Sequence, residues 1–251
     1  MPKFCANLSM LFTELPLNER PAAAARAGFD AVEVLFPYDE NAAELGTAIA
    51  RAGVPLALIN CPPPNYVDPE GPRGFAALAA EQARFRQAFR RTLRYAGALG
   101  AEFVHIMAGV AEGPEARAVF VENLRWAAAA APKQKLTIEP INTRDMPGYF
   151  LCDFDLAMGI LAEVDAPNLF LQFDAYHAAR MDLDVMSTWD AVKARVAHVQ
   201  VGGVPNRHEP QGGDFDYPAF FKMLDGQKYG GWVSGEYRPA GRTEDGLAWI
   251  R

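Results

Sequence analysis

The sequence predicts a single (β/α)8 barrel, the TIM-barrel architecture, as one domain over residues 1–251. Short apolar segments of strand type recur along the whole chain, and segments of helical composition lie between most of them. This alternation continues through eight predicted strands without a linker-like break, which favours one closed parallel sheet. The length of 251 residues agrees, because single α/β barrels often reach about 200–250 residues.

The predicted strands are short apolar runs spaced along the chain. They cover residues 3–10, 31–36, 56–60, 103–109, 135–141, 169–177, 196–203 and 231–237. The clearest predicted helices cover residues 18–28, 40–53, 81–100, 115–131 and 154–164. Several of them end in glycine or near a proline, as helix C-termini commonly do. The alternation of these two kinds of segment therefore defines the order of the elements.

A doubly wound open sheet is the alternative fold. Such a sheet would be expected to carry a glycine-rich phosphate loop after its first strand, and NLSMLFTELP, residues 7–16, contains no glycine. The longest connection, residues 61–80, is rich in proline and glycine. Connections of this length are usually lids, binding loops or mobile segments, so we expect these residues to border the site.

Composition narrows the class of partner. Half of the residues are hydrophobic, the net charge is −7 and the pI is about 5.2, so no basic footprint for a nucleic acid is indicated. The three cysteines have no CxxC spacing, which fits a reducing compartment. The N-terminal segment lacks the apolar run of a signal peptide, and no stretch approaches the ~20 apolar residues of a membrane span. We therefore expect a cytoplasmic protein that binds neither nucleic acid nor membrane.

Four oxygen-bearing side chains follow the last four predicted strands. They are Glu139, Asp174, Gln200 and Glu236. Active sites of TIM barrels lie at the C-terminal strand ends, and adjacent strands are about 4.8 Å apart, so we expect these side chains to meet. Three carboxylates meeting without a cation would repel one another, and a divalent ion would resolve the conflict. A ligand set of oxygens favours Mg²⁺ or Mn²⁺ over zinc. A lone glutamate at a strand end is more often a loop-solvating group, so the interpretation depends on the convergence of all four.

Three histidines and one further glutamate lie near these positions. His177 follows Asp174 by three residues, and His198 precedes Gln200 by two on the same strand face, where we expect it to pack deeper in the barrel. His105 lies inside the fourth predicted strand, either as a core residue or as a wall of the pocket. Glu33, near the end of the second predicted strand, is placed to point inward and has no role assigned beyond lining the pocket.

Basic residues on the predicted loops are candidates for binding an anionic substrate. Arg207 and His208 follow the seventh predicted strand, and a solvated loop is the alternative reading for both. Arg144 and Arg238 are further candidates on the loops after the fifth and eighth predicted strands.

Motifs along nearly the whole chain resemble those of one enzyme family. They are FCANLSMLFTELP, AGFDAVEVLFPYD, VHIMAG, IEPINTRDMPGYFL, FDAYHA, HVQVGGVPNRHEP and GEYRPAGRTEDGL. In this order they resemble the hydroxypyruvate isomerase and 2-oxo-tetronate isomerase family, within the xylose isomerase-like sugar isomerase and epimerase barrels. RHEP, residues 207–210, and GEYRP, residues 235–239, are the most specific of them.

The resemblance implies roles for the residues that match the family's motifs. Glu139 and Glu236 would act as the acid/base pair and also bind the metal. Asp174 and Gln200 match the remaining metal positions, although the wider epimerase family commonly has a histidine where Gln200 stands. His177 and Arg207 match residues that contact the substrate.

The implied activity is a metal-dependent isomerisation of hydroxypyruvate to tartronate semialdehyde by proton transfer through an enediolate. One glutamate would remove a proton from C3 and the other would return a proton at C2. Arg207 would bind the substrate carboxylate through paired hydrogen bonds. Barrels of this family often pair, so a homo-oligomer is a further expectation, although no motif marks an interface.

Other activities on the same scaffold stay open. A 2-oxo-tetronate isomerase or a ketose 3-epimerase needs a wider pocket, which we expect residues 61–80 to control. An endonuclease that cuts at abasic sites through several metals would need more histidines than the four in this chain, and the acidic charge argues against DNA. A non-catalytic sugar-acid sensor should have lost at least one of the four predicted ligands, and all four are present.

Overall fold

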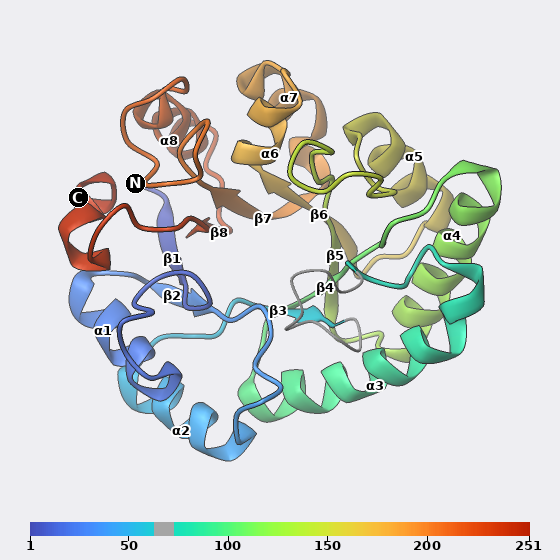
Figure 1. Cartoon of the computed structure of the whole chain (residues 1–251), viewed down its shortest axis with the longest axis horizontal. Coiled ribbons are helices and arrows are strands. Elements are labelled where there is room, and N and C mark those ends of the chain that lie inside the picture. The colour runs from blue at the N-terminus through green and yellow to red at the C-terminus, as the bar shows by residue number, and fades with distance from the viewer. Residues whose placement is uncertain (63–72) are drawn as a thin grey trace.

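The computed structural model describes residues 1–62 and 73–251, so residues 63–72, half of the predicted binding loop at 61–80, lie outside the described residues. Eight strands form one parallel sheet in the order β2-β1-β8-β7-β6-β5-β4-β3, with the helices arranged around it (Figure 1). The two ends of the sheet also meet, because Val32 bridges Leu56 and the Val34 amide donates to the Leu58 carbonyl at 3.1 Å. The sheet is therefore a nearly closed barrel, which confirms the predicted fold and excludes the open sheet.

The strands are shorter than the sequence predicted. They are β1 (Lys3–Asn7), β2 (Ala31–Glu33), β3 (Leu58–Cys61), β4 (Phe103–Ile106), β5 (Lys135–Ile138), β6 (Leu169–Asp174), β7 (Val196–Val201) and β8 (Trp232–Gly235). The clearest difference is in the predicted strand 169–177, which ends at Asp174. The Asp174 carboxylate accepts a hydrogen bond from the Tyr176 amide at 2.8 Å and so caps a helix that starts at Ala175.

The helices cover the outside of the barrel (Figure 1). They are α1 (Arg20–Ala27), α2 (Ala42–Ala52), α3 (Gln82–Leu99), α4 (Gly113–Ala130), α5 (Phe154–Val164), α6 (Ala175–Arg180), α7 (Val185–Val192) and α8 (Tyr217–Gly226). Short 3-10 segments lie at Leu17–Glu19, Ala79–Glu81, Lys193–Arg195 and Thr243–Ile250. Among residues 1–62 and 73–251, no helix is both long and apolar enough to cross a membrane.

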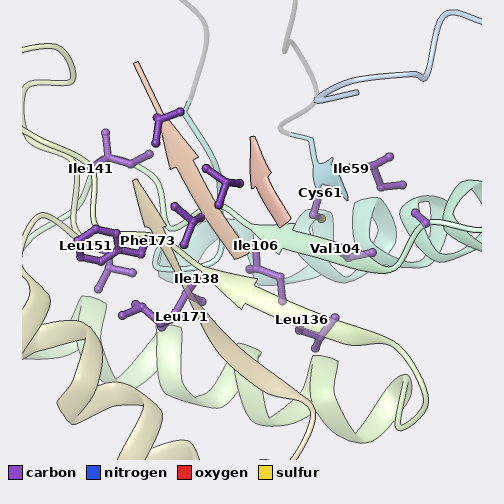
Figure 2. Close-up of a cluster of buried hydrophobic side chains, with 14 of the residues drawn as sticks. Ile59, Cys61, Val104, Ile106, Leu136, Ile138, Ile141, Leu151, Leu171 and Phe173 are labelled. Carbon is purple, nitrogen blue, oxygen red and sulfur yellow. The ribbon is translucent and has the colours of Figure 1, made fainter. Parts of the chain in front are cut away.

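Side chains on each strand alternate between two environments. Figure 2 shows one of them: pairs such as Ile59 and Cys61 on β3, or Leu171 and Phe173 on β6, belong to the apolar layer between sheet and helices. The residues between them point into the barrel because successive strand side chains face opposite sides. A small apolar cluster that includes Leu58 fills part of the interior. Polar side chains occupy the rest, toward the C-terminal strand ends.

Candidate functional site

A cavity of about 980 Å³ lies at the C-terminal end of the barrel. Its lining includes side chains from β4, β6 and the segments that follow β5, β6, β7 and β8, namely His105, Gln172, Glu139, His177, Arg207 and Glu236. Four of these are residues that the sequence marked for catalysis or substrate binding. The cavity is therefore where the candidate chemistry must occur.

Every strand contributes one buried polar side chain within a residue of its C-terminal end. In strand order these are Asn7, Glu33, Asn60, His105, Glu139, Asp174, Gln200 and Glu236. We call this set the strand-end ring. The four residues predicted from the last four strands are half of it, and the other half comes from β1 to β4.

Glu139 and Asp174 lie close together with His177. One ligand atom from each falls within 4.8 Å of the others, which makes this the one such histidine, cysteine or carboxylate group among the described residues. His177 Nε2 is 3.6 Å from Asp174 Oδ2 and 3.9 Å from Glu139 Oε1. Glu139 Oε1 is buried and has no hydrogen-bond partner among the residues described. The predicted set thus comes together in part, with His177 beside it rather than Glu236.

Arg207 connects the other two acidic residues. Its Nη2 donates to Asp174 Oδ2 at 3.1 Å and also to Glu236 Oε2. The guanidinium stacks on the Tyr176 ring, with its carbon 4.8 Å from the ring centroid. The arginine that the sequence marked for anion binding therefore lines the cavity and contacts two acidic side chains, Asp174 and Glu236.

Burial and mutual repulsion shift the pKa values of the acids. Burial, followed by the charges of Glu236 and Asp174, raises the pKa of Glu139 well above its usual value. Burial also raises the pKa of Glu236 to about 8 and raises that of Asp174, while Arg207 lowers both. The same carboxylates raise the pKa of Arg207 against the opposing effect of its burial.

The amide of Gln200 is fully buried and is held by two neighbours, Gln172 and Glu33. Its Oε1 accepts from Gln172 Nε2 at 2.7 Å, and its Nε2 donates to Glu33 Oε1 at 2.9 Å. Gln172 Nε2 also donates to Glu139 Oε2 at 3.1 Å. Gln200 therefore presents its oxygen toward the acidic side of the site, although a glutamine lies between it and Glu139.

Glu33 supports the site from below. Its Oε1 accepts from Asn7 Nδ2 at 2.8 Å as well as from Gln200, and its Oε2 lies 2.7 Å from His198 Nε2. Asn7 also donates to Glu236 Oε1 at 3.3 Å. His198 thus packs beneath Gln200 as predicted, and Glu33, which had no assigned role, orients two members of the strand-end ring.

The donor set suits a divalent cation. It combines two close carboxylates whose burial raises their pKa values, a buried carboxylate oxygen without a hydrogen-bond partner among the described residues, and the amide oxygen of Gln200. A dication would relieve this repulsion, and oxygen donors of this kind suit Mg²⁺ or Mn²⁺. The residues present therefore fit the predicted metal.

The remaining candidates lie in different places. His105 lines the cavity, with Nε2 3.7 Å from Glu139 Oε2, and burial lowers its pKa to about 3. Arg238 also lines the cavity. Arg144 pairs instead with Asp182 on the exposed surface, and His208 Nδ1 lies 2.8 Å from the Arg238 carbonyl, so it links two loops.

Sequence reasoning missed several residues that hold the site together. They are Asn7, Gln172, Asn142, Asp145 and Tyr176. The sequence contains a pattern that could have identified two of these residues, Asn7 and Gln172. Asn7 ends an apolar strand run, and Gln172 precedes Asp174 by two residues and so shares its strand face. Asn142 and Asp145 lie in the loop after β5, where no periodicity marks them.

The comparisons with known proteins agree with this arrangement. The family model described as a xylose isomerase-like TIM barrel matches residues 21–251. A 2-oxo-tetronate isomerase of Cupriavidus necator is 46% identical over 100% of this chain and 98% of that protein. A putative hydroxypyruvate isomerase of Homo sapiens is 42% identical over 99% of this chain and 94% of that protein. A crystal structure described as an AP endonuclease, family 2, from Brucella melitensis has a TM-score of 0.94 at 41% identity, covering 100% of this chain and 98% of that one.

Proposed function

This chain belongs to the xylose isomerase-like TIM barrel family, as an isomerase of its hydroxypyruvate and 2-oxo-tetronate isomerase group, and from that premise we propose that it interconverts hydroxypyruvate and tartronate semialdehyde. One observation carries the proposal: two buried glutamates, Glu139 and Glu236, line one cavity from the ends of β5 and β8. A pair of this kind supports proton transfer between adjacent carbons of a bound substrate.

The reaction moves two protons. One glutamate removes a proton from C3 of hydroxypyruvate to give an enediolate, and the other delivers a proton to C2. The C3 hydroxyl proton passes to the former carbonyl oxygen, so the product carries an aldehyde at C3 and a hydroxyl at C2. Each glutamate acts as the base in one direction and as the acid in the other. The pKa of Glu236, raised by burial to about 8, suits this role, because a group that both takes and gives a proton works best near the ambient pH.

A divalent cation, Mg²⁺ or Mn²⁺, would be held by Glu139, Asp174, Gln200 and Glu236, and when bound it supplies Lewis-acid polarisation of the substrate oxygens. Arg207 binds the substrate carboxylate, for which its planar fork is suited. Its position in the cavity supports this role, and so does the ring of Tyr176 beneath the guanidinium. His177 contacts the substrate beside Glu139.

Two variants test the acid/base pair. Glu139→Gln and Glu236→Gln should each lower turnover of hydroxypyruvate by about 10²–10⁴-fold, because each removes a proton-transfer group and keeps its shape. Glu44→Gln, an exposed glutamate on α2, is the matched control and should keep full activity. EDTA should abolish activity, and Mn²⁺ or Mg²⁺ should restore it. Near-normal turnover in either buried variant would sink the assignment.

Isomerisation of 2-oxo-tetronate is the second candidate. The relative from Cupriavidus necator carries that name, and a cavity of about 980 Å³ has room for one more carbon. Side-by-side assays of hydroxypyruvate, 2-oxo-tetronate and ketoses, compared by kcat/KM, decide between them and a ketose 3-epimerase.

An endonuclease is the candidate from a different class, and it is the name given to the Brucella melitensis protein. The net charge of −7 argues against a DNA substrate, and two of the four histidines already have protein partners: His198 contacts Glu33, and His208 contacts the Arg238 carbonyl. We therefore expect no cleavage of DNA that contains abasic sites.

A further inference from the structure

His177 stands between two possible roles that need opposite states of its Nε2 atom. As a metal ligand, Nε2 must carry a lone pair, whereas as a hydrogen-bond donor to a substrate it must carry a proton. Its position beside Glu139 and Asp174 is compatible with either role. Which state is present depends on the partner of the other ring nitrogen, Nδ1.

The partner of Nδ1 is the side-chain amide of Asn142. Asn142 Nδ2 lies 2.6 Å from His177 Nδ1, and both side chains are buried. Since an amide nitrogen only donates, Nδ1 must accept. An Nδ1–H would place two donors against each other, which excludes the Nδ1–H tautomer and also the imidazolium in this arrangement.

The orientation of the Asn142 amide is fixed by Asp145. Asn142 Oδ1 accepts from the Asp145 backbone N–H at 2.9 Å, and Asn142 Nδ2 donates to Asp145 Oδ2 at 3.0 Å. A flipped amide would point its oxygen at a carboxylate and its NH₂ group at a backbone N–H. Two unfavourable contacts would replace two hydrogen bonds, so the network itself assigns the amide.

Asp145 is in turn held as a charged acceptor. Tyr176 Oη donates to Asp145 Oδ2 at 2.7 Å, and Arg180 Nη2 lies 3.7 Å from Oδ1. Partial burial would raise the pKa of Asp145, but hydrogen bonds from Asn142 and Tyr176 lower this pKa below its usual value. The side-chain nitrogen of Asn142 therefore donates both to the Asp145 carboxylate and to His177 Nδ1.

We propose that Asn142, oriented by Asp145, is a positioning residue that keeps His177 in the neutral Nε2–H tautomer. His177 then donates a hydrogen bond from Nε2 into the cavity and does not ligate the cation. In the isomerisation proposed above, on which this role depends, this proton faces the substrate oxygen that gains negative charge as the enediolate forms.

Nitrogen NMR of the histidine side chains tests the tautomer directly. The chain has four histidines, so a long-range ¹H–¹⁵N spectrum of ¹⁵N-histidine protein at neutral pH is resolvable, and His177→Gln identifies the signals of His177. We expect a protonated Nε2 and an unprotonated Nδ1, which addition of Mg²⁺ leaves unchanged. A proton on Nδ1 of the wild-type protein, or loss of the Nε2 proton on addition of Mg²⁺, would overturn the proposal.

Asn142→Asp supplies the second measurement. It places an acceptor opposite Nδ1 at nearly unchanged shape, so His177 should gain an Nδ1 proton, and kcat/KM should fall about 10–100-fold. Asn41→Asp, the same change at the exposed N-cap of α2, should alter neither signal nor rate. A His177 spectrum unchanged in folded Asn142→Asp would contradict the proposal. If the variant does not fold, the wild-type spectrum alone decides.

The two proposals fail separately. A wild-type protein with the Nε2–H pattern but without isomerase activity on any of the substrates would refute the proposed function and leave the tautomer assignment standing. An active isomerase whose His177 carries its proton on Nδ1 would refute only the assignment.

Discussion

Binding of a divalent cation to this site should release protons, in an amount that follows from the buried carboxylates. Burial raises the pKa of Glu236 to about 8, so at pH 7 this group is about nine-tenths protonated in the metal-free protein. A cation requires the ionised form of its ligands, and binding must expel that proton. Glu139, whose pKa is also raised, adds to the release. We therefore expect at least about one proton per ion bound at pH 7.

The raised pKa of Glu236 also determines the direction in which cation affinity changes with pH. The Glu236 proton alone should weaken apparent cation affinity about tenfold at pH 7, or about 1.4 kcal/mol, relative to pH well above 8. Affinity should therefore rise with pH. Calorimetric titration with Mn²⁺ in two buffers of different ionisation enthalpy measures the protons released, and the same titration near pH 9 should show a smaller release.

Glu236→Gln separates the contribution of this residue, because the amide has no proton to expel. Its proton release at pH 7 should fall by about nine-tenths of a proton. A wild-type release close to zero at pH 7 would refute the reasoning, since the carboxylates would then be ionised already or would not bind the ion.

Three further outcomes are expected. Gln172→Leu should lower activity and Mn²⁺ affinity about 10–100-fold, because it removes the donor that holds both Glu139 and Gln200; unchanged kinetics and titrations would show that this amide does not position them. Phe173→Ala should lower the free energy of unfolding, measured in urea, by about 3–5 kcal/mol, because the Phe173 ring packs against three aromatic rings at centroid distances of 5.3, 5.5 and 6.2 Å. Phe173→Leu should lose less stability, and a loss below about 1 kcal/mol in the alanine variant would count against this packing. The folded pKa of Glu236 lies above its ordinary value of 4.5, so its stabilising contribution is complete below about pH 4.5 and is lost as pH rises through about 8; thermal melts of the metal-free protein should show this decline, and melts with Mn²⁺ should not.

The barrel was predictable because the alternation of apolar runs and helical segments is a local property. The ends of the strands were harder to predict. The run 103–109 remains apolar after β4 ends at Ile106, because Ala108 and Gly109 are buried in the loop that follows. The helix Ala175–Arg180 was hidden for a similar reason, because its first residues continue the apolar run of β6. Only the side chain of Asp174 marks the change, by capping the helix.

The same distinction applies to the site: the positions of residues on single strands could be predicted, whereas the contacts between strands could not. Glu139, Asp174, Gln200 and Glu236 were found because a rule about strand ends selects positions one strand at a time. The contacts among them depend on register between strands, which no single strand encodes. The pairing of Asn7 with Glu33 is an example, since it requires β1 and β2 to be adjacent and in step.

The pairing of β1 with β8 has a consequence for how the protein acquires activity. Asn7 donates to Glu236 across 229 residues of sequence, and β8 lies between β1 and β7. During translation β8 is the last strand to emerge, so one of the two proposed proton-transfer groups reaches its partner only after the rest of the barrel has been made. Contacts this distant also slow folding. Recovery of activity on refolding should therefore report closure of the whole barrel, while early helix formation should leave the enzyme inactive.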